Sequence, residues 1–153
     1  MELLLVIDIQ EKYMEFYRAD LIDAVNAHIA YAKENNIPVI YIKNVGLLGD
    51  SEDYKFADEL KIVSDDIFLK KIPSAFSNDL FFKRLKEMVI DTIDVVGVDG
   101  RCCVYKTVMD AVKLGYRVRL HLDAIAARSD KFYSKELESM KAAGVIAERK
   151  EPL

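Results

Sequence analysis

Residues Val95–Thr107 read VVGVDGRCCVYKT, and this stretch decides the fold. An apolar run typical of a buried strand passes through Gly97, and a few residues later a cysteine opens an amphipathic segment. A thiol at that position lies at a helix N-terminus, where unpaired backbone N–H groups and the helix dipole favour the thiolate. Because the thiolate is the nucleophilic form, the pattern indicates a reactive cysteine. The alternative is a buried cysteine that packs as a small hydrophobe.

Strand-like and helix-like segments alternate along the rest of the chain. Strands are expected at residues 3–9, 38–43, 66–70, 94–98, 117–122 and 145–148. Helices are expected between the first two strands, ending at Asn35-Asn36, and at about 78–88, 103–114 and 130–143. Residues 44–65 are the least regular stretch, with a short helical piece near 57–61, and are expected to border a pocket. Strands separated by helices predict an α/β fold, in which a mainly parallel sheet is covered on both faces.

Two further charged positions lie at the ends of predicted strands. Asp8 interrupts the apolar run Leu3–Ile9, and a buried carboxylate is costly unless it is paired or hydrogen-bonded. Lys70 and Lys71 end the strand at 66–70. Open parallel sheets place their ligands at the carboxyl ends of the strands. Asp8, one lysine and one cysteine are therefore candidates for a common site, although strand-end charges that are merely solvated remain an alternative.

The sequence resembles the isochorismatase-like cysteine hydrolases, which include nicotinamidases and N-carbamoyl amidohydrolases. That family carries an apolar-Asp-x-Gln strand, a Lys-x-x-x-Ser-Ala-Phe segment and a Gly-x-x-x-x-x-Cys-Val-x-x-Thr segment, in this order. The matching residues here are Ile7-Asp8-Ile9-Gln10, Lys70 with Ser74-Ala75-Phe76, and Gly97 with Cys103-Val104 and Thr107. Segments 115–118 and 122–124 also look like the family. The resemblance implies a three-layer α/β/α sandwich with a six-stranded, Rossmann-like sheet in the order 3-2-1-4-5-6.

The resemblance also implies a catalytic triad. Its Cys-Val-x-x-Thr register selects Cys103 over Cys102 as the nucleophile, and the distance to Ser74 selects Lys70 over Lys71. An ammonium beside the sulfur would lower the thiol pKa. Asp8 would act as general base toward the thiol and then as general acid toward the leaving amine.

Further roles follow from the same resemblance. The family's oxyanion-binding amides correspond to the backbone N–H groups of Asp99 and Cys103, presented through a cis Val98–Asp99 peptide. Gln10, Tyr13, Phe76 and Arg101 are candidate substrate-binding residues. Many relatives have other residues at 99–101. A cation at a helix N-terminus opposes the helix dipole, so Arg101 needs another role at this position. The roles that we expect are pairing with Asp99, contact with a neighbouring subunit or binding of an anionic substrate.

No metal or cofactor is expected. Related nicotinamidases carry an Asp-x-His segment after the second strand, whereas residues Lys43–Leu48 contain no histidine. The only histidines, His28 and His121, are far apart in the sequence and lack ligand spacing.

Composition bounds the remaining possibilities. The 153 residues suit a single domain, 1–153, and the formal net charge of −4 gives no support to a nucleic-acid partner or an anionic membrane. The sequence lacks an apolar run of about 18 residues and a signal-peptide pattern. Its two adjacent cysteines cannot build a disulfide framework, which indicates a cytoplasmic protein.

The leading hypothesis is a metal-independent cysteine hydrolase that cleaves a C–N bond of a small amide or carbamoyl compound through a thioester. The alternatives are a catalytically silent family member that acts as a binding or assembly module, an isochorismatase-type hydrolase, and a redox-active Cys102-Cys103 pair. A homodimer or higher homo-oligomer is expected from the resemblance, since a neighbouring subunit helps a small open site to exclude water.

Overall fold

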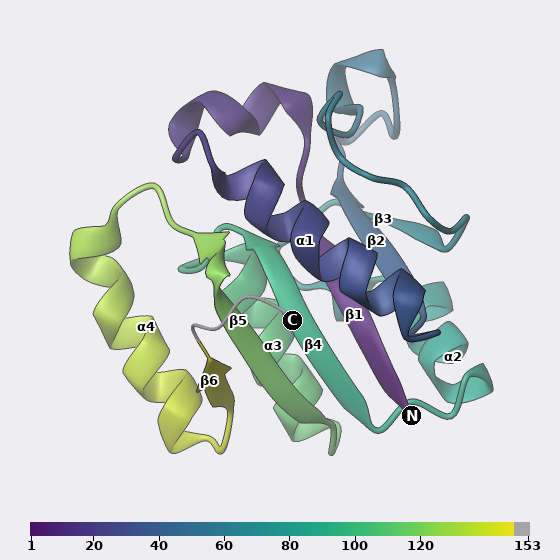
Figure 1. Cartoon of the computed structure of the whole chain (residues 1–153), viewed down its shortest axis with the longest axis vertical. Helices are drawn as coiled ribbons and strands as arrows, with labels where there is room; N and C mark the ends of the chain where they lie inside the picture. The colour runs from purple at the N-terminus through teal and green to yellow at the C-terminus, as the bar shows by residue number, and fades with distance from the viewer. Residues whose placement is uncertain (149–153) are drawn as a thin grey trace.

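Six parallel strands form one sheet in the order β3-β2-β1-β4-β5-β6 (Figure 1). The structure is a computed structural model, and it describes residues 1–148 apart from the side chains of residues 130–132. The strands are β1 Glu2–Ile7, β2 Val39–Asn44, β3 Ile67–Lys70, β4 Thr92–Val98, β5 Arg117–Ala126 and β6 Ile146–Glu148. The predicted strand order is thereby confirmed. The end of the predicted domain, residues 149–153, lies outside the described residues.

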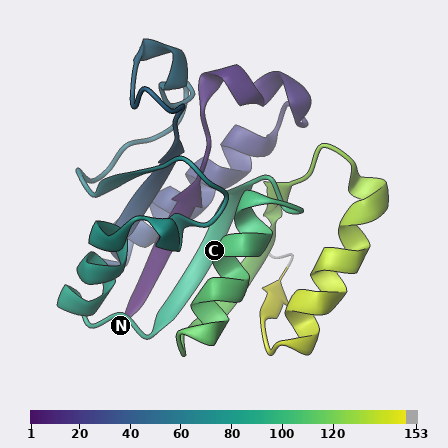
Figure 2. The ribbon, with the colours of Figure 1, turned by 180° about the vertical axis from the view of Figure 1, so that it is seen from behind.

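Helices cover both faces of the sheet. Helix α1 (Leu21–Glu34) lies over one face, and α2 (Asp79–Glu87), α3 (Cys103–Lys113) and α4 (Asp130–Ala142) lie over the other (Figures 1 and 2). Short 3-10 helices are formed by η1 Glu11–Phe16, η2 Glu52–Tyr54 and η3 Ala75–Ser77. The three-layer α/β/α sandwich expected from the sequence is therefore present.

Strand β1 separates two apolar cores. Its side chains alternate, as in any strand: Leu3 and Leu5 join the core under α2, α3 and α4, whereas Leu4 and Val6 join the core under α1. All four side chains are buried. A strand that is apolar on both faces is typical of a parallel sheet covered by helices, and it anchors the residue that follows it.

Two expected elements differ from the structure. The prediction of a short helix near residues 57–61 is wrong, because this segment lies beside the residues that follow β1. The Ala57 N–H donates to the Ile9 carbonyl, and Phe56 forms a bridge with Gln10. Strand β5 continues four residues beyond the predicted end at Leu122, with an irregular register opposite β4. Within residues 1–148, no helix combines the length and apolar character needed to cross a bilayer.

Candidate active site

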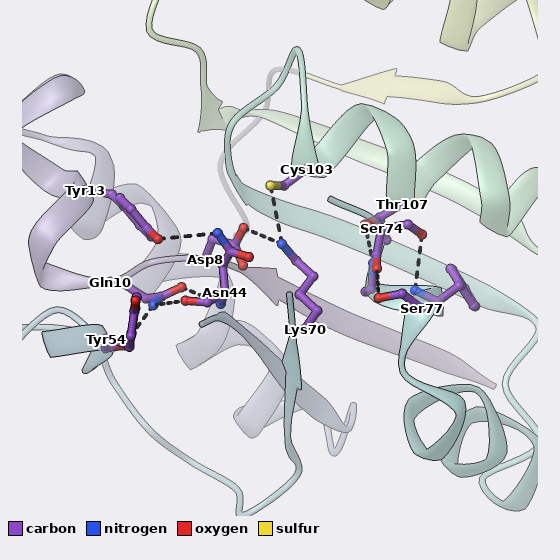
Figure 3. Close-up of polar contacts among 12 residues, drawn as sticks. Asp8, Gln10, Tyr13, Asn44, Tyr54, Lys70, Ser74, Ser77, Cys103 and Thr107 are labelled. Carbon is purple, nitrogen blue, oxygen red and sulfur yellow. Dashed lines mark hydrogen bonds and ion pairs between the residues drawn. The ribbon is translucent and has the colours of Figure 1, made fainter. Parts of the chain in front are cut away.

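Three strand ends bring Asp8, Lys70 and Cys103 into contact. Asp8 follows β1, Lys70 is the last residue of β3, and Cys103 is the first residue of α3, just after β4. Although β2 separates β3 from β1, the long Lys70 side chain bends back over the sheet edge (Figure 3). Its Nζ lies 2.9 Å from Asp8 Oδ2 and 3.3 Å from Cys103 Sγ. The two lysines differ as expected, because Lys71 is exposed and donates to the Leu47 carbonyl.

The ion pair between Lys70 and Asp8 is buried. Each residue is only 3% exposed, so neither charge is stabilised by bulk water. Burial raises the pKa of the Asp8 carboxyl above its ordinary value, although the Lys70 ammonium acts in the opposite direction. Among the described residues, Asp8 Oδ1 has no hydrogen-bond partner. One carboxylate oxygen is thus held by Lys70, while the other can accept a proton.

The Cys103 thiol is harder to ionise than the sequence predicted. Burial raises its pKa to about 12, the Asp8 carboxylate acts in the same direction, and Lys70 partly compensates. The expected lowering of the thiol pKa is therefore wrong, because loss of water around the sulfur outweighs the nearby ammonium. The resting side chain of Cys103 is therefore a thiol, which would have to lose its proton in order to act as a nucleophile. Cys102, in contrast, is exposed.

A cavity of about 470 Å³ opens beside these groups. It is lined by Asp8, Tyr13, Tyr17, Asn44, Val98, Asp99, Arg101, Cys102, Cys103, Arg128 and Ser129. This volume suits a small organic molecule. The structure brings Tyr13, Asp99 and Arg101 to the cavity with Asp8 and Cys103, as the sequence analysis expected.

Two expected substrate-binding residues do not line this cavity. Gln10 is fully buried, and its side-chain amide donates to the carbonyls of Asn44 and Tyr54 and accepts from the Asn44 N–H (Figure 3). Gln10 therefore holds the end of β2 against η2. Phe76 packs in an aromatic cluster with rings that include Phe81 and Tyr116.

Some cavity residues were not anticipated. Tyr17 follows η1, Asn44 ends β2, and Arg128 and Ser129 come just after β5. The strand-end rule could have selected Asn44 and Arg128, because both lie at the same carboxyl edge of the sheet as Asp8. Tyr17 has no comparable signal, since it lies in a connection without a regular apolar pattern.

The loop between β4 and α3 is held by its own aspartate. The Val98–Asp99 peptide is cis, as predicted. The Asp99 carboxylate accepts hydrogen bonds from the Tyr17 hydroxyl and from the backbone N–H groups of Arg101 and Arg128. The Arg101 guanidinium forms a 3.7 Å ion pair with Glu136. These contacts fix the loop that leads into Cys103.

The cavity lacks the histidine ligands of a typical catalytic zinc site, although the thiols of Cys102 and Cys103 line it. No histidine is among the described lining residues, and both carboxylates are engaged, Asp8 by Lys70 and Asp99 by three N–H or O–H donors.

Comparison with known proteins agrees with this geometry. The profile of the Isochorismatase domain matches residues 2–151, so the chain belongs to the isochorismatase family of hydrolases. No curated protein matches the chain in sequence.

Solved structures share the fold. An isochorismatase family protein from Desulfovibrio vulgaris is 20% identical, with a TM-score of 0.85 over 95% of this chain and 92% of that one. N-carbamoylsarcosine amidase from Thermoplasma acidophilum is also 20% identical, with a TM-score of 0.82 over 99% and 98%. Pyrazinamidase from Pyrococcus horikoshii, solved in complex with zinc, is 22% identical, with a TM-score of 0.81 over 95% and 97%.

Proposed function

We propose that the protein is a cysteine hydrolase that cleaves the C–N bond of a small amide or carbamoyl compound, without a metal ion in the reaction. One observation carries this proposal: a single buried ammonium, that of Lys70, bridges the Asp8 carboxylate and the Cys103 thiol at the wall of the cavity. A general base, a nucleophile and a fixed positive charge within hydrogen-bond reach are what acyl transfer through a thioester requires. The names of two structural neighbours, an amidase and a pyrazinamidase, are consistent with C–N substrates.

The first half of the reaction forms the thioester. Asp8 takes the proton from the Cys103 thiol as Sγ attacks the carbonyl carbon. The backbone N–H groups of Asp99 and Cys103 are the proposed donors to the oxyanion; Cys103 opens α3, where the first N–H groups have no acceptor within the helix. Protonated Asp8 then donates its proton to the nitrogen, the C–N bond breaks, and ammonia or an amine leaves.

The second half returns the enzyme to its starting state. Ionised Asp8 accepts a proton from water, whose oxygen attacks the thioester carbonyl. The C–S bond breaks, the acid leaves, and the proton returns to the Cys103 sulfur. Because burial raises the pKa of Asp8, this carboxyl can hold the proton between the two transfers.

The charge of the cavity favours a substrate with an anionic group. The guanidinium-bearing residues Arg101 and Arg128 both line it. Arg101 also pairs with Glu136, and the carboxylates of the cavity are engaged by Lys70 and by the loop, so Arg128 is the principal candidate to bind such a group. Arg128 also stacks on the Phe16 ring, with 3.6 Å between the guanidinium carbon and the ring centroid. A partly fixed guanidinium is a good partner for a carboxylate.

A screen of small amides and carbamoyl compounds, each with and without a carboxylate, tests the proposal through release of ammonia or amine. Cys103→Ala should lower kcat/KM roughly 10⁴-fold or more, because the nucleophile is gone. Asp8→Asn should lower it about 10²- to 10⁴-fold, because an amide cannot carry the proton. Mass spectrometry should detect an acyl adduct on the peptide that contains Cys103.

Cys102→Ser is the matched control and should retain most of the activity. Turnover that survives Cys103→Ala, or an adduct on Cys102 alone, would contradict the proposed mechanism. A folded chain that releases no amine from any compound and forms no adduct would instead support the silent binding module.

A further inference from the structure

A second cluster of titratable side chains lies between α1 and β5. His28 comes from the inner face of α1, and His121 and Asp123 come from β5. The two imidazole centroids are 4.5 Å apart, and one potential ligand atom from each of the three residues lies within 4.8 Å of the others. None of the three lines the cavity beside Cys103. The fold therefore joins two histidines whose sequence spacing gave no sign of a metal site.

Two buried atoms in this cluster have no hydrogen-bond partner among the described residues. They are His121 Nδ1 and Asp123 Oδ1. The other Asp123 oxygen, Oδ2, lies 2.8 Å from His28 Nε2. Buried polar atoms without partners are rare and costly, so two of them at one place need an explanation.

The neighbouring Asp94 determines which nitrogen of His121 is available. His121 Nε2 lies 2.8 Å from Asp94 Oδ1, and Arg119 contacts both oxygens of that carboxylate. Both oxygens of the Asp94 carboxylate accept hydrogen bonds from the Arg119 guanidinium, so this group acts as a charged acceptor toward the imidazole. Nε2 must then carry the hydrogen, which leaves the lone pair of Nδ1 free.

This arrangement matches the surroundings of metal-binding histidines. Such a histidine usually donates its second ring N–H to a carboxylate, which orients the ring and makes the ligating nitrogen more basic. Asp94 supplies that carboxylate, and its own charge is balanced by Arg119. Arg18, in contrast, donates to the backbone carbonyl of Asp123 and not to its carboxylate. The Asp123 side chain is thus a partly buried carboxyl group with two imidazoles as neighbours.

We propose that His28, His121 and Asp123 bind a divalent transition-metal ion, with Zn²⁺ as the representative ion. His121 would bind through Nδ1, His28 through Nε2 and Asp123 through its carboxylate, with water in the fourth position. Tetrahedral bonds of about 2.0–2.1 Å place ligand atoms about 3.3 Å apart, so only small side-chain movements are needed. His28 would adopt the tautomer with its hydrogen on Nδ1.

The ion would cross-link α1, through His28, to β5, through His121 and Asp123. Both histidines must be neutral to bind it. The site is separate from the proposed catalytic groups, so its occupancy is expected to affect stability and not the chemistry at Cys103.

The test uses the full chain, stripped of metal with a chelator and titrated with Zn²⁺ in a calorimeter. One equivalent should bind, and the melting temperature should rise with the Zn²⁺ concentration. Asp123→Asn and His121→Asn should each weaken binding at least about 100-fold, because a direct ligand matters more than its supporting partner. Asp94→Asn should weaken it about 10- to 100-fold. Titration with Co²⁺ should give visible absorption bands of a nitrogen- and oxygen-ligated ion.

The matched control is the double variant Cys102→Ser/Cys103→Ser, which removes the other strong zinc ligands. Unchanged binding by this variant supports the site at α1 and β5, whereas loss of binding assigns the metal to the thiols and overturns the proposal. Failure of the unaltered chain to bind one equivalent of Zn²⁺ also overturns it. Binding by Asp123→Asn and His121→Asn that is as tight as binding by the unaltered chain overturns it too. If His121→Asn does not fold by circular dichroism, Asp123→Asn decides, because it keeps the size of the side chain.

Discussion

Asp8 affects the thiol through its charge before it takes part in any reaction. Its carboxylate raises the pKa of Cys103, whereas Lys70 lowers it. The two residues should therefore have opposite effects on thiol ionisation and the same effect on catalysis. This difference separates a reacting triad from three polar residues that merely pack together.

Alkylation by iodoacetamide in a Cys102→Ser background measures this effect, because only Cys103 can then react. Asp8→Asn should lower the thiol pKa and speed alkylation at a given pH, and Lys70→Met should raise the pKa and slow it. Both variants should lose hydrolysis. Lys71→Ala should leave the rate of alkylation unchanged. Slower alkylation in Asp8→Asn would show that the carboxylate does not act on the sulfur.

Glycine is required at position 97 because the backbone of β4 lies very close to the backbone of β1 there. It has a φ of 126°, and a Cβ added there would lie 2.2 Å from the Ile7 carbonyl oxygen in β1. Gly97→Ala should reduce the free energy of unfolding by about 4 kcal/mol or more in urea titrations. Gly115 also has a positive φ, 93°, but open space around it. Gly115→Ala should cost only about 1–2 kcal/mol, and equal losses would refute the role of the β1 contact.

The sequence allowed the three residues of the candidate site to be selected, but it did not predict their ionisation. Asp8, one lysine and one cysteine were recognisable because each ends or follows an apolar strand, and parallel strands share one carboxyl edge. The choice of Lys70 and Cys103 came from the resemblance to the family motifs. The direction of the thiol pKa depends on how much water reaches the sulfur, which spacing along a chain does not report. Tyr17 was missed because it belongs to a connection with no periodic pattern, and Arg128 was missed because β5 runs four residues beyond its predicted end.

At the scale of elements, one hydrogen bond joins α3 to the segment that follows Lys70. The hydroxyl of Thr107 accepts from the Ala75 N–H at 3.0 Å, and both residues are buried (Figure 3). The Thr107 position of the family motif thus places η3 against the helix that carries the nucleophile. Without this contact, a buried N–H would lack a partner.

Thr107→Val should destabilise the protein by about 1–3 kcal/mol, because the Ala75 amide loses its acceptor. Hydrogen exchange at Ala75 should accelerate in this variant. Thr107→Ser keeps the hydroxyl, so Ala75 should stay protected although the lost methyl costs about 1 kcal/mol. Unchanged exchange in Thr107→Val would mean that another group satisfies the amide.

The regular elements were predictable and the irregular ones were not. Helix α3 begins at its predicted residue and ends one residue before its predicted limit, and α1 ends next to the predicted Asn35-Asn36, because apolar spacing and terminal glycine or asparagine residues mark them. Segment 57–61 was assigned as helix from its local pattern, yet Ala57 bonds to Ile9. That contact crosses nearly fifty positions, and no local pattern contains it.

At the scale of the whole molecule, exposed apolar side chains in the segments after β2 and β3 favour self-association, which we propose on this basis. Leu47 and Leu48, in the turn after β2, are almost fully exposed, and Ile72 is more than half exposed. Lys71 donates to the Leu47 carbonyl, so the turn and the end of β3 are neighbours. A contiguous exposed apolar surface commonly marks an interface.

Sedimentation at micromolar concentration should show species larger than the 17.5 kDa protomer. Leu48→Glu should shift the protein to the protomer, because a charge cannot be buried there without a partner. Leu80→Glu on α2, which also replaces an exposed apolar side chain, is the control and should not change the mass. A sample of the unaltered chain that sediments only as the protomer would rule out the association.

The central pairing of β1 with β4 affects how the protein is synthesised. Glu2 pairs with Thr92 and Ile7 with Gly97, so the partners lie about 90 residues apart along the chain. At about 5–20 residues per second, a ribosome produces β4 roughly 5–20 s after β1. During that interval an apolar strand has one unpaired edge, which other nascent chains can join. We therefore expect the nascent chain to be most prone to association with other chains in the interval before β4 has emerged.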